Sequence, residues 1–276
     1  MKLHKTVILI ASVVSSLAAA DTAGSLRMGS AGPAPSVTGT IEVGAGSSYI
    51  FRGIREAEEN LEANLELSYE RFYAGIWTLK PFCRGESNQV DWSVGLRGEP
   101  GRRFVWDLGL VYHTFPGFHH GTFGTRRGPE AHAGLSMALT QRLAATAYLY
   151  HDWRRKASTA EGRLTWQQPF SNIPALFIGD LFAGNVHSRN LFPEKPLPRW
   201  DEDYSYYGFT LRAEYRLFPQ VTLTPGVQYS GHRNLRRGNH SANTALPASP
   251  CDDCGPHDHH LENDSWWWFL RLTRTF

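Results

Sequence analysis

Apolar and polar residues alternate strictly in segments of about ten residues, and this limits how the chain can fold more than any other feature. In the segment 61–70 the odd positions from Leu61 to Tyr69 are apolar or aromatic, whereas the even positions from Glu62 to Glu70 are polar. A helix would scatter these side chains around its circumference, but a strand places each kind on its own face. The segment is therefore predicted to be a β-strand with one apolar and one polar face.

The same pattern recurs along the chain and predicts twelve strands. A tilted strand spans a bilayer with about 9–11 residues, and each segment is close to this length. An even number of strands is typical of single-chain bacterial barrels. We therefore predict an all-β fold, a single antiparallel transmembrane β-barrel. The segment 175–186 is almost apolar on both faces, so its facing stays open. The predicted strands are 37–53, 61–70, 73–80, 89–97, 104–113, 130–139, 143–153, 160–167, 175–186, 206–217, 221–230 and 266–276.

The connections alternate in length, as they do in membrane barrels. Short turns are predicted at 71–72, 99–101, 140–141, 169–174 and 218–220, and longer loops at 54–60, 81–88, 114–129, 154–159, 187–205 and 231–265. Short periplasmic turns and long extracellular loops are the barrel pattern. A soluble β-sandwich is not expected to alternate loop length so regularly.

The two ends of the sequence agree with export to the bacterial outer membrane. Lys2 and Lys5 precede an apolar run at 7–14 and three alanines at 18–20, a pattern typical of a signal peptide cleaved before Asp21. Residues 21–36 are rich in Gly, Ala, Ser and Pro and are predicted to be a flexible lead-in to a barrel at 37–276. The chain ends on Phe276, and a C-terminal aromatic residue on an amphipathic strand is expected to be read by the outer-membrane assembly machinery.

Aromatic residues gather at the ends of the predicted strands. Tyr49 and Phe51 are expected near the outer rim, and Tyr73 near the inner rim. Two belts of amphipathic rings at the two interfaces are typical of membrane barrels, so outer-membrane lipid is the expected partner of the outer wall.

Two stretches resemble a known family. Ser47, Tyr49, Arg52 and Gly53 fit approximately a Ser-x-Tyr-x-x-Arg-Gly pattern, and a Tyr-x-Gly-x-Trp element follows at 73–77. Together they are similar to the opening of the TorF-type porins, also known as the Gcw family of conserved bacterial outer-membrane proteins. The resemblance covers about 35 residues and implies an outer-membrane barrel named as a porin by analogy only.

Composition and motifs exclude several classes of function. The formal net charge is +2 with no basic run, so no nucleic-acid partner is expected. No phosphate loop or dinucleotide motif occurs, and no cofactor is predicted. His187 and Ser188 are adjacent, and Asp152 and Asp180 lie on strands, but no Gly-x-Ser-x-Gly or His-x-Ser spacing occurs. No catalytic residues are therefore predicted, and the chain is not expected to be an enzyme.

Charged residues of both signs occupy the inward positions and are the candidate lumen lining. In one interpretation they line a water-filled path that passes small polar solutes. In the other they pair across a narrow lumen and hold the barrel together. The predicted function is a channel for passive passage of such solutes, with a structural or adhesive barrel as the alternative and a lipid-modifying enzyme less favoured. The candidates are Glu42, Glu62, Glu66, Asp91, Arg97, Asp107, His113, Glu130, His132, Glu161, Arg163, Arg212, Glu214, Arg216 and Arg271.

The last loop carries a second candidate site. Cys251, Cys254, His257 and His259 lie close together, as a Zn²⁺ or Cu site requires. The oxidising exterior favours a Cys251–Cys254 disulfide instead, which would leave Cys83 unpaired. A metal site is therefore not the favoured interpretation.

Overall fold

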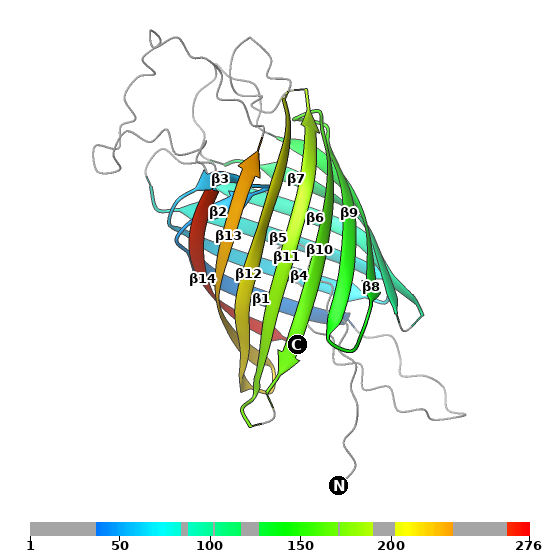
Figure 1. The fold of residues 1–276 in the computed structure, drawn as a ribbon, viewed down its shortest axis with the longest axis vertical. Helices are drawn as coiled ribbons and strands as arrows, with labels where there is room; N and C mark the ends of the chain where they lie inside the picture. Colours follow the sequence, from blue (N-terminus) through cyan, green and yellow to red (C-terminus); the bar gives the residue numbers. More distant parts are fainter. Residues whose placement is uncertain are drawn as a thin grey trace.

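A computed structural model describes residues 37–83, 88–101, 103–116, 127–170, 172–189, 202–233 and 264–276. The predicted signal peptide and lead-in at 1–36 lie outside these residues, as does most of the predicted loop at 231–265. Within them, no helix is long and apolar enough to cross a membrane. The architecture is a closed antiparallel barrel of twelve strands, as predicted, with one additional two-stranded sheet (Figure 1).

Each barrel strand pairs antiparallel with the strand beside it in sequence, and β1 pairs with β14 to close the ring. At this seam Val43 lies opposite Leu272. Because the ring is closed, the barrel leaves no strand edge unpaired. The strands are β1 (Val37–Gly46), β4 (Asn60–Tyr69), β5 (Phe72–Pro81), β6 (Gln89–Gly101), β7 (Phe104–Thr114), β8 (Gly128–Ala138), β9 (Leu143–Asp152), β10 (Ala157–Pro169), β11 (Ala175–Ser188), β12 (Glu202–Phe218), β13 (Val221–Arg233) and β14 (Asp264–Thr275).

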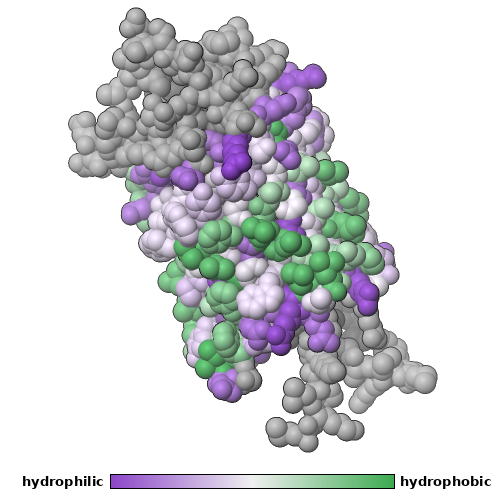
Figure 2. All heavy atoms as spheres, in the orientation of Figure 1, coloured by the Kyte–Doolittle hydropathy of each residue, from purple (hydrophilic) through white to green (hydrophobic). Residues whose placement is uncertain are grey.

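The outer wall is apolar and the inner wall polar, the reverse of a soluble protein. Figure 2 shows hydrophobic side chains gathered in a band across the visible face, with hydrophilic side chains toward both ends. The facing of β11, which the sequence left open, follows the same rule: Asp180 is 2% exposed and faces inward, whereas Leu181 is 59% exposed on the outer wall. An apolar band around a closed barrel is the surface that a bilayer requires, so the fold is that of a transmembrane barrel.

Turns and loops separate to opposite ends of the barrel. The connections at 70–71 and 219–220 are tight turns, and β1 begins and β14 ends at that same end (Figure 1). At this end Gly39 and Phe276 exchange two backbone hydrogen bonds of 2.8 and 2.9 Å, which hold the last residue against β1.

The first predicted strand is wrong beyond residue 46. The chain leaves the wall after Gly46 and forms a small hairpin of β2 (Tyr49–Phe51) and β3 (Ile54–Ala57), called here the inner hairpin, before Asn60 rejoins the wall. Its two central residues, Arg52 and Gly53, have φ of 50° and 80°, as a tight two-residue hairpin turn requires. Period-two alternation continues through the bend because β2 is itself extended.

Aromatic rings fill glycine notches on the inner wall. Tyr148 of β9 lies over Gly134 of β8, where an added Cβ would come within 2.1 Å of the ring. Tyr73 of β5 lies in the same way over Gly95 of β6, at 2.3 Å. Tyr73 is 8% exposed and faces the lumen, so its predicted place in the lipid-facing belt is wrong.

Candidate functional site in the lumen

The barrel encloses a cavity of about 320 Å³, lined by the walls and by the inner hairpin. Glu42 and Arg216 do not line it. Glu42 lies 3.7 Å from Arg271 of the lining, whereas Arg216 is exposed near the end of β12. The structure places the other predicted lumen residues around the cavity: Glu62, Glu66, Asp91, Arg97, Asp107, His113, Glu130, His132, Glu161, Arg163, Arg212, Glu214 and Arg271.

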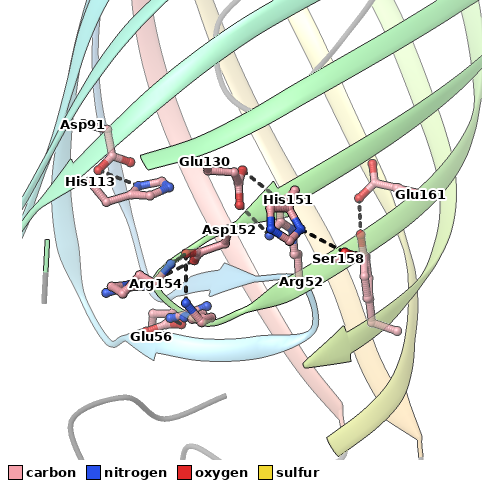
Figure 3. A network of polar contacts seen from close by, with 12 residues as sticks. Arg52, Glu56, Asp91, His113, Glu130, His151, Asp152, Arg154, Ser158 and Glu161 are labelled. Atoms are coloured by element: carbon pink, nitrogen blue, oxygen red, sulfur yellow. Dashed lines mark hydrogen bonds and ion pairs between the residues drawn. The ribbon is translucent and has the colours of Figure 1, made fainter. Parts of the chain in front are cut away.

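The inner hairpin crosses the lumen and is tied to the opposite wall by charge. Arg52 donates two hydrogen bonds to the Glu130 carboxylate of β8, at 2.8 and 2.9 Å, and its guanidinium lies 4.3 Å from the centre of the Tyr150 ring (Figure 3). Both side chains are nearly buried, at 9% and 5% exposed. A second pair joins Glu56 of β3 to Arg155 of the β9–β10 turn at 2.6 Å. These two ion pairs fix the hairpin between β8 and β10.

An apolar contact completes the anchor. Ile54, at the start of β3, is 4% exposed in a cluster with Phe182, Val186, Tyr206 and other residues of β10, β11 and β12. A Cβ at Gly53 would lie 2.6 Å from the Cβ of Tyr206, so the turn sits directly on the wall. Burying an isoleucine side chain contributes about 1.5–3 kcal/mol, so Ile54 stabilises the hairpin in its position against the wall.

At its base the hairpin packs on the neighbouring wall. The Tyr49 ring lies 5.2 Å from the Trp77 ring of β5. Tyr49 and Phe51 therefore line the cavity and not the outer rim, which corrects their predicted place. Tyr49, Arg52 and Gly53, three residues of the Ser-x-Tyr-x-x-Arg-Gly pattern, lie in β2 and in the turn of the inner hairpin.

Asp107 of β7 lies at the centre of a polar cluster on the wall. The hydroxyls of Tyr73 and Tyr148 donate to its two carboxylate oxygens at 2.9 and 3.1 Å. Arg97 lies 3.9 Å and His132 3.7 Å from the same carboxylate. Four side chains from neighbouring strands β5, β6, β8 and β9 thus satisfy one buried charge, which stiffens this side of the wall.

The remaining lumen charges also pair, mainly along the wall. Arg271 of β14 lies 3.4 Å from Glu62 of β4, so an ion pair spans the closing seam. On other strands Arg163 pairs with Glu161 at 3.1 Å and His113 lies 3.0 Å from Asp91. These pairs join near neighbours and, unlike the Arg52–Glu130 pair, do not reach across the lumen.

The charge balance of the cavity is slightly negative. Seven carboxylates and five arginines line it, which leaves a surplus of two negative charges when both histidines are neutral. Sequence reasoning missed Arg52, whose inward direction depends on the bend at Gly46. It also missed Asp180, which pairs with Arg212, because the segment 175–186 is almost apolar on both faces.

The predicted last-loop site lies outside the described residues, since Cys251, Cys254, His257 and His259 all fall in the segment 234–263. In the part of the chain that the structure describes, no group of His, Cys, Asp or Glu residues is arranged to hold a metal ion. Cys83 is disulfide-bonded, so the expectation that it is unpaired is wrong. The sequence holds two other cysteines, Cys251 and Cys254, both outside the described residues.

Comparisons with known proteins find solved structures that are similar in fold at low sequence identity. No family model matches the chain, and no curated protein matches it. The NanC porin is 13% identical with a TM-score of 0.49, covering 85% of this chain and 98% of its own. The KdgM porin is 8% identical with a TM-score of 0.49, covering 86% and 99%. OccK8 (OprE) of Pseudomonas aeruginosa is 9% identical with a TM-score of 0.38, covering 87% and 97%.

Proposed function

We propose that the chain is a passive outer-membrane channel for small polar solutes, with a mouth narrowed by the inner hairpin. The observation that carries this proposal is the charge-lined cavity of about 320 Å³ behind a hairpin held by side-chain contacts. An inner wall of paired charges and hydroxyls offers hydrogen bonds to polar solutes and to the water around them, and it gives apolar solutes no favourable contact. The hairpin contacts described above are non-covalent, so the hairpin is able to leave the mouth.

The charge surplus supports a weak preference for cations. With seven carboxylates against five arginines, the cavity favours a small cation over an anion of equal size. The preference is expected to be modest because most of these charges are neutralised by a neighbour within 4 Å. The proposed solute class is therefore small, hydrated and neutral or positively charged.

A closed structural barrel is the second candidate, and a specific observation favours it. The Arg52–Glu130 and Glu56–Arg155 pairs, together with buried Ile54, hold the hairpin across the lumen at three points. If these contacts never break, the lumen stays closed and the barrel serves as a scaffold for its outer loops.

Placement in the bacterial outer membrane is part of the proposal. The apolar outer band and the closed ring support a lipid partner around the wall. We further propose that Phe276, paired at its backbone with Gly39, is the residue that the assembly machinery reads before the seam closes.

Single-channel recording of the refolded chain in planar lipid bilayers tests the function. Gly46 lies directly opposite Asn60, so residues 48–58 can be replaced by two glycines to join β1 to β4 without the inner hairpin. We expect small conductance steps from the natural chain, larger and steadier steps from the shortened one, and a reversal potential that favours potassium over chloride. Silence from both folded proteins would leave the closed scaffold as the function.

A further inference from the structure

Four polar side chains form one row on the outer wall of the barrel. In the strand register His151 of β9 lies opposite Ser158 of β10, Ser158 opposite His187 of β11, and His187 opposite Asp203 of β12. All four are exposed, whereas their chain neighbours Tyr150, Thr159 and Val186 are buried on the inner face. Side chains directly opposite one another on antiparallel strands are about 5 Å apart at Cβ, so the row is one contiguous cluster.

Hydrogen bonds pair the members of the row. His151 Nδ1 lies 3.0 Å from the Ser158 hydroxyl, and Figure 3 shows the two side chains facing each other from neighbouring strands. The Trp153 ring meets the His151 ring edge-on at 5.0 Å and limits its rotation. On the other side of Ser158, His187 Nδ1 is hydrogen-bonded to the Asp203 carboxylate.

The row lies at the edge of the apolar band. The next row on the outer wall, toward the middle of the apolar band, includes Leu149 of β9 and Ala160 of β10, and Leu149 is 64% exposed. An open groove of about 600 Å³ lies here and is lined by Leu149, Ala160, Ser158 and His187 among others. A fatty acyl chain fits the apolar part of such a groove, which places the ester that carries it at the level of Ser158.

We propose that this row is a second, catalytic site that hydrolyses fatty acyl esters of membrane lipids. Ser158 is the nucleophile and His151 the general base, because they already share a hydrogen bond. His187 is the donor to the ester carbonyl oxygen, and Asp203 holds its ring through Nδ1. The proposal needs the membrane placement above but not an open lumen, since all four residues lie outside the barrel.

The reaction balances with water as the only co-reactant. The Ser158 oxygen attacks the acyl carbon while its proton passes to His151 Nδ1. The carbonyl oxygen becomes an oxyanion, which accepts a hydrogen bond from His187 Nε2 when both ring nitrogens of His187 are protonated. The bond to the lipid alcohol then breaks, and His151 returns the proton to the leaving oxygen. Water attacks the acyl-serine with His151 again as base, which releases the fatty acid and restores Ser158.

The test uses the refolded full chain in mixed micelles with one of two ester sources, phosphatidylethanolamine or lipopolysaccharide, and measures fatty acid release by mass spectrometry. A fluorophosphonate probe, followed by peptide mapping, reports independently whether Ser158 is activated. We expect release from at least one source and a label on Ser158. The source that releases fatty acid identifies the lipid.

Variants separate the roles. S158A is expected to reduce release to background, and H151F to lower it by about 10²–10⁴-fold and abolish the label. H187F is expected to lower release by about 10²–10³-fold, and H187Q, which keeps an N–H donor, to retain more of it. Y112F, which removes another exposed outer-wall hydroxyl on β7 and away from the groove, serves as the control and should release at the natural rate.

The proposal fails if the folded natural chain releases no fatty acid from either source, with or without a label on Ser158. It also fails if S158A and Y112F release equal amounts. Folding of each variant is checked by the heat-dependent shift in gel mobility. Conductance of S158A should match that of the natural chain, so a failed hydrolase leaves the channel proposal standing.

Discussion

Removing the Arg52 side chain is expected to open the mouth of the barrel. Arg52 and Glu130 are 9% and 5% exposed, and truncating one partner of a buried ion pair costs about 3–5 kcal/mol because the other charge is left unpaired. Water in the adjacent cavity hydrates the abandoned carboxylate, so the lower end, about 3 kcal/mol, is the appropriate magnitude. Since about 1.4 kcal/mol is a factor of ten, the ratio of displaced to inserted hairpin should rise about 100-fold in R52A.

Single-channel recording of the open fraction checks this magnitude. R52K keeps the charge but loses one of the two hydrogen bonds, so it should fall between the natural chain and R52A. R163A removes an arginine from the same cavity and serves as the control for charge alone, because Arg163 pairs with Glu161 and not with the hairpin. The double variant R52A/E130A should have an open fraction no higher than that of R52A, since the two substitutions remove the same contact. An equal rise of the open fraction in R52A and R163A, or no rise in R52A, would refute a role of the Arg52–Glu130 pair in holding the mouth closed.

Three further predictions concern the barrel itself. A Cβ at Gly95 would lie 2.3 Å from the Tyr73 ring and 2.6 Å from a backbone oxygen, so G95A should lower the free energy of unfolding by about 1–3 kcal/mol in urea titrations. A Cβ at Gly162 would meet nothing within 4 Å, so G162A should change that free energy by no more than about 0.5 kcal/mol. L181R puts a charge on the lipid-facing middle of β11 and should cost about 2–4 kcal/mol in the same assay in bilayers, with L181A much closer to the natural chain. Peptide mapping without reductant should find Cys83 linked to the peptide that holds the other two cysteines, and recovery of an unlinked Cys83 peptide would contradict this.

The wall of the barrel could be predicted because the two solvents on its two sides differ so much. Lipid outside and a polar lumen inside impose a period of two on every strand, and that period depends on local sequence alone. The one ambiguous strand, β11, illustrates the limit. Asp180 is its one charged residue between Ala175 and Val186, and only the barrel shows that this residue faces inward.

The inner hairpin could not be predicted from the sequence, since its partners lie far along the chain. Arg52 bonds to Glu130, 78 residues away, and Arg155 reaches Glu56 across 99 residues. Tyr49 and Phe51 keep the alternation of β1 through the bend, so a periodicity argument extends the strand. The sequence also places Ser158 and His151 in different segments, and only the register of β9 and β10 brings them together.

The distribution of the hairpin contacts decides how the mouth can open. Arg52 binds β8, Glu56 binds the β9–β10 turn, and Ile54 is buried against β10, β11 and β12, yet all three residues lie within five positions of one tight hairpin. A rigid two-residue turn cannot release one of these side chains far without moving the others, so the contacts should break together. The mouth then has two states, and weakening any one anchor shifts the same equilibrium. The Asp107 cluster, which joins wall strands and does not touch the hairpin tip, should instead change the stability of the barrel without changing its open fraction.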